Sequence, residues 1–82
     1  MKYPLVQTLA INQYEIFTDV GVYFQSYQTI IAFIPFKGPV QLDQKWDASR
    51  TTVKYLGKVL LKDKKTILAA IKSGIIVLAE LN

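Results

Sequence analysis

Clustered positive charge is the feature of this sequence that points most directly to chemistry. Of its ten Lys and Arg residues, eight fall between residues 45 and 72, where there are only two acids. Arg50, Lys54 and Lys58 recur every four residues, which places them on one side of a helix. Such a row of cations can contact successive phosphates and release their counterions. The spacing therefore indicates a polyanion-binding face, although an ordinary helix also keeps charged side chains on its outer face.

The bend that precedes this helix, residues 45–52, holds the only Trp and the only Arg of the chain. Asp47 and Ser49 are both suited to cap the helix, because a short side-chain oxygen accepts amide protons of the first turn. A helix start also directs its amides outward, which makes the first turn a candidate phosphate site. The simpler interpretation is a capped helix whose Trp46 packs on the core.

Two groups of side chains form the predicted contact surface. The residues predicted to bind a nucleic acid or another anion are Lys45, Arg50, Thr51, Thr52, Lys54 and Lys58. The residues predicted to stack on bases or to contact a partner are Tyr27, Trp46 and Tyr55. Because aromatic rings are more often buried in a core, stacking is the bolder of the two interpretations for them.

The residue types give catalysis little support. The sequence contains no His and no Cys, which removes the commonest general base, the commonest metal ligand and the thiolate nucleophile. Asp43 and Asp47 could share a cation, but Asp47 is better explained as a helix cap. No glycine-rich phosphate-binding loop is recognisable. We therefore expect a protein that is not an enzyme and that needs no metal or cofactor.

Hydrophobic periodicity and turn residues predict an α+β fold in a single domain. The expected elements are strands over residues 5–11, 14–18, 22–36 and 40–42, helices over about 48–61 and 64–73, and a strand over 75–81. This order, four strands, two helices and one strand, predicts a mainly antiparallel sheet of about five strands with two helices on one face. Asp63 is expected to cap the second helix and Gly74 to end it. Gly57 costs about 1 kcal/mol inside the first helix, which indicates close packing or a bend.

The fraction of apolar residues is higher than the core of so small a domain can bury. Residues 30–34 are apolar on both faces, as is typical of a central strand covered by a helix on one side and by a partner on the other. The hydrophobic content of 51% over 82 residues likewise predicts apolar surface that another subunit covers. We expect a homo-oligomer, most simply a homodimer. The longest apolar run, residues 30–36, is too short to span a bilayer, so no membrane partner is expected.

Three segments resemble a family of small uncharacterised proteins encoded by tailed phages and related mobile elements. They are residues 24–32, residues 45–55 with the pattern Trp-Asp-x-Ser-x-Thr-Thr, and the Lys-rich helix that closes on Ser73-Gly74 before Leu81-Asn82. The resemblance extends over about residues 22–82. It implies a viral accessory protein in the cytoplasm of a host cell, and it implies no activity, cofactor or binding residue.

Three functions remain open at this point. The first is non-enzymatic contact with nucleic acid through the basic helix face, without a recognisable base-reading motif. The second is inhibition or sequestration, in which the bend at residues 46–52 captures a host protein or an anionic nucleotide. The third is self-association through the apolar strands as a structural module.

Overall fold

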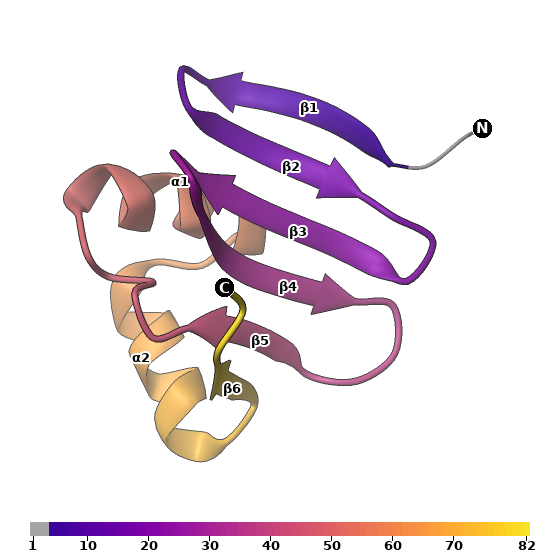
Figure 1. The fold of residues 1–82 in the computed structure, drawn as a ribbon. Helices are drawn as coiled ribbons and strands as arrows, with labels where there is room; N and C mark the ends of the chain where they lie inside the picture. Colours follow the sequence, from indigo (N-terminus) through magenta and orange to yellow (C-terminus); the bar gives the residue numbers. More distant parts are fainter. Residues whose placement is uncertain (1–3) are drawn as a thin grey trace.

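The structure is a computed structural model, and it describes residues 4–82 of the chain. Within these residues the chain forms six strands and two helices (Figure 1). Their bounds are β1 Leu5–Ala10, β2 Gln13–Phe17, β3 Gly21–Ser26, β4 Thr29–Pro35, β5 Val40–Asp43, α1 Arg50–Leu60, α2 Lys64–Ser73 and β6 Ile76–Ala79.

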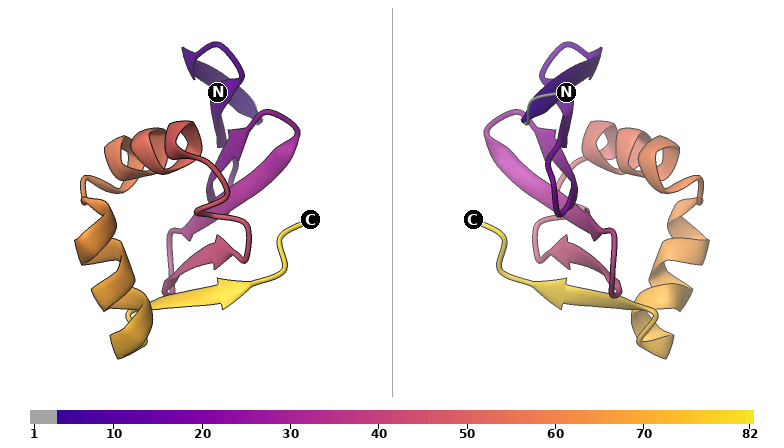
Figure 2. Two further views of the ribbon diagram at one scale, coloured as in Figure 1. Left: turned by 90° about the vertical axis from the view of Figure 1, so that its left-hand side faces the viewer. Right: turned by 90° about the vertical axis from the view of Figure 1, so that its right-hand side faces the viewer.

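All six strands belong to one sheet, in the order β1-β2-β3-β4-β5-β6. The first five pair with antiparallel neighbours, whereas β6 runs parallel to β5. A parallel pair needs a long connection, because the chain must return to the end where the first strand began. Here α1 and α2 form that connection, and both lie on the same face of the sheet (Figure 2). The α+β class, the mostly antiparallel sheet and the two helices on one face are thus as expected.

The expected strand count was wrong, because residues 22–36 form two strands, β3 and β4, instead of one. The turn between them consists of Tyr27 and Gln28, and Tyr27 adopts a left-handed backbone conformation with φ of 56°. The Gln25 side-chain amide donates to the Tyr27 carbonyl at 2.7 Å. Tight hairpin turns usually contain Gly, Asn or Asp, so the sequence of this turn carried none of the ordinary signals.

The hydrophobic core lies between the helices and the sheet face that they cover. Its fully buried apolar residues are Phe24, Ile31, Ala32, Leu42, Trp46, Leu56, Ile67, Ala70 and Ile76. Phe24, Ala32 and Leu42 are paired across three adjacent strands, so they form a row that points toward the helices. Trp46 is only 4% exposed, which agrees with the simpler interpretation of the bend and rules out its prediction as a stacking surface for bases.

Both helices carry side-chain caps. Ser49, and not Asp47, caps α1, because the Thr52 amide donates to the Ser49 hydroxyl oxygen at 3.1 Å. Asp63 caps α2 by accepting the Thr66 amide at 2.8 Å, and Gly74 ends that helix with φ of 85°, as predicted. The Thr66 hydrogen bonds hold the pKa of the Asp63 carboxyl below its usual value.

Gly57 lies where the turn between the helices folds back on α1. The amides of Leu61 and Lys62 both donate to the Gly57 carbonyl, with the Lys62 bond at 3.0 Å. A Cβ atom on Gly57 would lie 2.8 Å from the Lys62 carbonyl oxygen. Close packing is therefore the reason that a glycine occupies this helical position.

Residues 80–82 cross the sheet face that the helices leave uncovered and reach β4 (Figure 1). Asp43 holds this tail, because its carboxylate accepts the Leu81 amide at 2.9 Å and the Lys45 amide at 3.0 Å. The Asn82 side chain exchanges two hydrogen bonds with the backbone of Ile30, at 2.8 and 2.9 Å. The Leu81 amide, followed by the Lys45 amide, lowers the pKa of the Asp43 carboxyl.

Replacement of Gly57 by Ala tests the close packing. Helix propensity alone predicts that Gly57→Ala raises the free energy of unfolding by about 1 kcal/mol. We expect the opposite, a decrease of about 1–3 kcal/mol, because the added methyl group meets backbone that cannot move aside. Urea denaturation followed by circular dichroism measures the change, and an increase in stability would contradict the packing described.

Acid titration of stability tests the role of Asp43. Because the folded-state pKa lies below the ordinary value of about 3.9, the ionised carboxylate stabilises the fold above that pH. The contribution is lost as the pH falls through the folded-state pKa. We expect Asp43→Asn to lower the free energy of unfolding by about 1 kcal/mol at pH 7, and by less at pH 2. Asp47→Asn, at an exposed position of the bend before α1, is the control for the loss of one negative charge.

Candidate nucleic-acid interface

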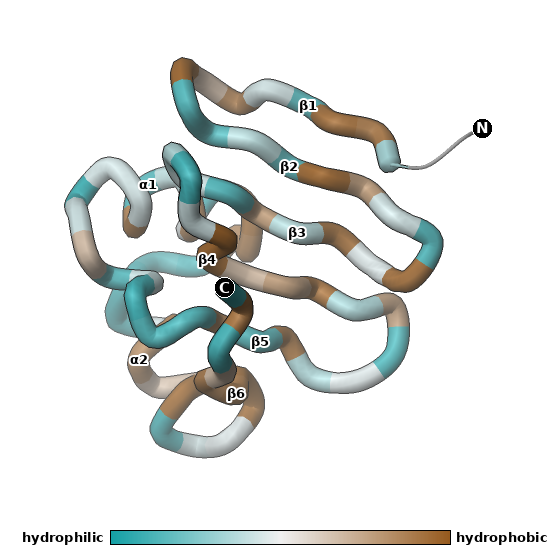
Figure 3. The backbone as a smooth tube through the Cα atoms, in the orientation of Figure 1, coloured by the Kyte–Doolittle hydropathy of each residue, from teal (hydrophilic) through white to brown (hydrophobic). Residues whose placement is uncertain are grey.

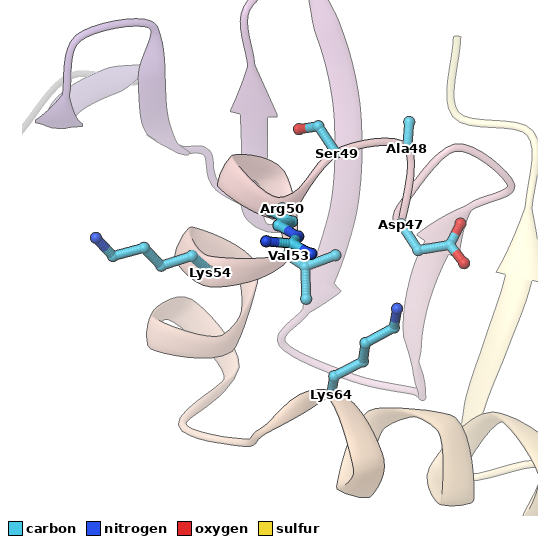
Figure 4. Close-up of a pocket in the computed structure, with 7 residues that line it drawn as sticks. All are labelled: Asp47, Ala48, Ser49, Arg50, Val53, Lys54 and Lys64. Carbon is cyan, nitrogen blue, oxygen red and sulfur yellow. The ribbon is translucent and has the colours of Figure 1, made fainter.

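Five cations line a groove between α1 and α2. It consists of two adjoining hollows of about 500 and 460 Å³, which share Val53, Lys54 and Lys64 and which we together call the basic groove. The first hollow is lined by Asp47, Ala48, Ser49, Arg50, Val53, Lys54 and Lys64 (Figure 4). The second is lined by Val53, Lys54, Gly57, Lys58, Leu61, Lys62, Asp63 and Lys64.

Positive charge dominates the walls of the basic groove. Its cations are Arg50, Lys54, Lys58, Lys62 and Lys64, and all five are exposed. One of its two acids, Asp63, already accepts the Thr66 amide as a helix cap. In Figure 4 the Lys64 side chain rises from the start of α2 toward the bend at Asp47, whereas Lys54 extends to the opposite side. The cations are therefore distributed along the groove and do not converge on one point.

The floor of the basic groove is apolar. Val53 is half-buried there, Gly57 exposes backbone, and Leu61 is 90% exposed at the end of α1. Leu61 adopts a left-handed conformation with φ of 58°, which turns the chain toward α2 and forms one end of the groove. An apolar floor between cationic walls suits a ligand whose charged groups alternate with less polar parts.

The Tyr55 ring makes cation–π contacts with two of these cations, Lys54 and Lys58. The Lys54 ammonium lies 5.5 Å, and the Lys58 ammonium 5.0 Å, from the centroid of the Tyr55 ring. Contacts of this kind are worth about 0.5–1 kcal/mol at exposed sites, so they restrict where the two Lys side chains extend. The half-buried ring also lines a smaller hollow with Leu9 and Glu15, on the side that faces the sheet. Tyr55 is thus placed to position Lys54 and Lys58.

The prediction that Thr52 binds an anion was wrong, because the Thr52 side chain is buried and only 5% exposed. Its hydroxyl hydrogen-bonds the Ser26 hydroxyl of β3 at 2.9 Å and accepts the Ser49 hydroxyl at 3.0 Å. The Thr52 amide donates a hydrogen bond to the Ser49 hydroxyl oxygen, and the Val53 amide donates one to the Ser49 carbonyl. Thr52 therefore joins α1 to the sheet and offers nothing to an anion.

The remaining predicted residues lie outside the basic groove. Lys45 lines a separate hollow with Asp43, Glu80 and Asn82, so the structure does not bring it together with Arg50. Thr51 and Tyr27 are exposed, but they line neither hollow of the basic groove.

Two of the five groove cations, Lys62 and Lys64, were missing from the predicted site. The Lys-rich stretch that follows α1 was the available signal. Their position opposite Arg50 and Lys54 depends on the angle at which the chain turns at Leu61, and periodicity within one helix does not reveal that angle.

Neither a metal centre nor a membrane-spanning helix is found within residues 4–82. No group of three or more Asp or Glu side chains in this range is placed to hold a metal ion. No helix in the same range is both long and apolar enough to cross a bilayer.

The chain matches the model of a protein family over most of its length. The model of a family of unknown function (DUF8033) matches residues 1–76. Neither the curated proteins nor the solved structures yielded a match to this chain. The family description mentions no phage and no Trp-Asp-x-Ser-x-Thr-Thr pattern, so the resemblance to phage-encoded proteins stays a prediction.

A pair of neighbouring substitutions tests the assignment of Thr52. Thr52→Val keeps the shape of the side chain but leaves the buried Ser26 hydroxyl without its partner, so we expect the free energy of unfolding to fall by about 1–3 kcal/mol. Thr51→Val makes the same chemical change on an exposed neighbour and should alter stability by less than about 0.5 kcal/mol. Urea denaturation of both variants measures the difference, and equal effects would contradict the assignment.

Proposed function

This chain belongs to the family of unknown function named above, and we propose that it is a non-enzymatic protein that contacts nucleic acid through the basic groove. The observation that carries the proposal is the presence of five exposed cations along one groove, four from α1 and α2 and one, Lys62, from the turn between them, with two acids among them. A phosphate backbone releases condensed counterions when such a row neutralises it, which favours binding without base recognition.

The length of the row suits a polyphosphate chain. Eight residues separate Arg50 from Lys58, which corresponds to about 12 Å along a helix axis. One strand of a duplex carries a phosphate about every 3.4 Å of its axis, so roughly three phosphates lie within that length. The apolar side chains of Val53 and Leu61, which line the groove, are available to the sugars and bases between the phosphates.

The distribution of charge favours a polymer over a single nucleotide. A free phosphate or nucleotide is best held where several donors converge, as in a glycine-rich loop or at an open helix start. In α1 the Thr52 and Val53 amides are already bonded to Ser49, and Lys54 and Lys64 extend in different directions. An extended polyanion can contact separated cations one after another.

Titration of labelled oligonucleotides at several salt concentrations tests this function. Fluorescence anisotropy with single-stranded DNA, duplex DNA and single-stranded RNA should show affinity that falls steeply with salt for at least one of them. We expect the triple variant Arg50→Gln, Lys54→Gln, Lys58→Gln to bind at least tenfold more weakly. The slope of the logarithm of its binding constant against the logarithm of the salt concentration should become shallower by roughly two.

A charge-matched triple variant is the control for this experiment. Lys45→Gln, Lys65→Gln, Lys72→Gln removes the same number of positive charges from exposed positions outside the basic groove. We expect its affinity to stay within about twofold of the native protein, since phosphate contacts act locally. Equal losses in the two variants, or binding that ignores salt, would reject the groove as a nucleic-acid site.

A further inference from the structure

The sheet face opposite the helices carries an uncharged row of side chains across all six strands. The strand register aligns Val6, Ile16, Tyr23, Phe33, Gln41 and Val77 in that row. The neighbouring row of Phe24, Ala32 and Leu42 points into the core, and side chains one residue apart on a strand point to opposite faces. The uncharged row therefore points away from the helices.

Aromatic packing makes the middle of this face well defined. The Tyr23 and Phe33 rings stack with their centroids 4.5 Å apart and 23° between their planes. The Phe33 ring also covers Gly21, because a Cβ atom there would lie 2.8 Å from the Phe33 Cε1 atom. The two rings border a hollow of about 570 Å³, whose lining residues are Asp19, Val20, Tyr23, Phe33, Pro35, Phe36 and Lys37.

Large apolar side chains remain exposed along this face. Phe36 is 65% exposed, Val6 is 59% exposed, and Val20 and Val77 are also exposed. Figure 3 marks hydrophobic residues along β1, β2, β3 and β4, and the strand register assigns Val6, Ile16 and Phe33 among them to this face. Several exposed apolar side chains on one sheet face are typical of an interaction site.

Charge favours a second copy of the chain as the occupant. Eight of the ten cations belong to residues 45–72, which form the bend and the two helices, so two copies repel each other on that side. The uncharged row offers no such repulsion. Two apolar faces of the same composition can pack as an aligned sandwich, with sheets about 10 Å apart and strands within about 30° of each other.

The turns at one end of the sheet supply charge complementarity for this packing. Asp19 lies on the turn between β2 and β3, and Lys37 on the turn between β4 and β5, at the same end of the sheet (Figure 1). These two turns are equally far from the midline of the six-stranded sheet, which runs between β3 and β4. A two-fold axis along that midline therefore brings Asp19 of each copy to Lys37 of the other.

We propose that two copies of this chain dock through their uncovered sheet faces as a two-fold symmetric β-sandwich, with Asp19 of each copy opposite Lys37 of the other. The tail at residues 80–82 covers the opposite end of this face, at Asp43 and Ile30, and leaves the Asp19 and Lys37 end bare. The two basic grooves then lie on the outer sides of the dimer, where each stays accessible.

Charge reversal tests the symmetry of the proposed dimer. Sedimentation velocity over a range of protein concentrations gives the dissociation constant of the native dimer. Asp19→Lys or Lys37→Asp alone creates two like-charge contacts per dimer, and we expect each to raise the dissociation constant at least tenfold. The double variant Asp19→Lys, Lys37→Asp has the native net charge and should return to within about threefold of the native value.

Apolar substitutions test the face independently of the charges. Phe36→Ser removes an exposed ring from the proposed interface and should also raise the dissociation constant at least tenfold. Leu61→Ser removes an even more exposed side chain from the helical side and should leave the dimer intact. A native protein that stays monomeric, a dimer that Phe36→Ser does not weaken, or single reversals that the double variant does not rescue would each overturn the proposal.

Discussion

The parallel pairing of β6 with β5 is the constraint on which the arrangement of this protein depends. β5 ends at Asp43, and β6 must start at the opposite end of the sheet, so the chain has to travel back across one face. Two short helices make that return, and the sheet face beneath them becomes the core side. Leu56 of α1 and Ile67 of α2 are fully buried against it together with Trp46. Because the apolar sides of both helices are committed to the core, their cations face outward, and Arg50, Lys54, Lys58 and Lys64 line the basic groove.

The same constraint leaves the protein with two unlike sides. The connection contributes both helices to one face, and residues 80–82 cover only part of the other. One side therefore presents concentrated positive charge, and the other presents a row of aromatic and aliphatic side chains with Asp19 and Lys37 at one end. A polyanion and a second copy of the chain would use different sides, so the two proposed interactions do not compete for surface.

Local signals were sufficient for much of the fold. Asp63 caps the start of α2 and Gly74 ends it, as their residue types indicate. Arg50, Lys54 and Lys58 lie on the exposed side of α1, as their spacing predicts. The hairpin turn at Tyr27 could not be found this way, because its left-handed backbone is imposed by strand pairing on a residue that rarely adopts it. Thr52 was equally hard to place, since its buried partner is Ser26, distant in sequence.

The sequence by itself determined the α+β class, the cap and end of α2 and the outward row of cations on α1, because these depend on contacts within a few residues. Only the tertiary structure decided which cations share a groove and which face of the sheet stays open. Lys62 and Lys64 join Arg50 because of the turn at Leu61, and Lys45 is separated from them because the bend at Trp46 directs it toward Glu80. Such relations depend on packing between elements, and side-chain type and spacing along one element do not encode them.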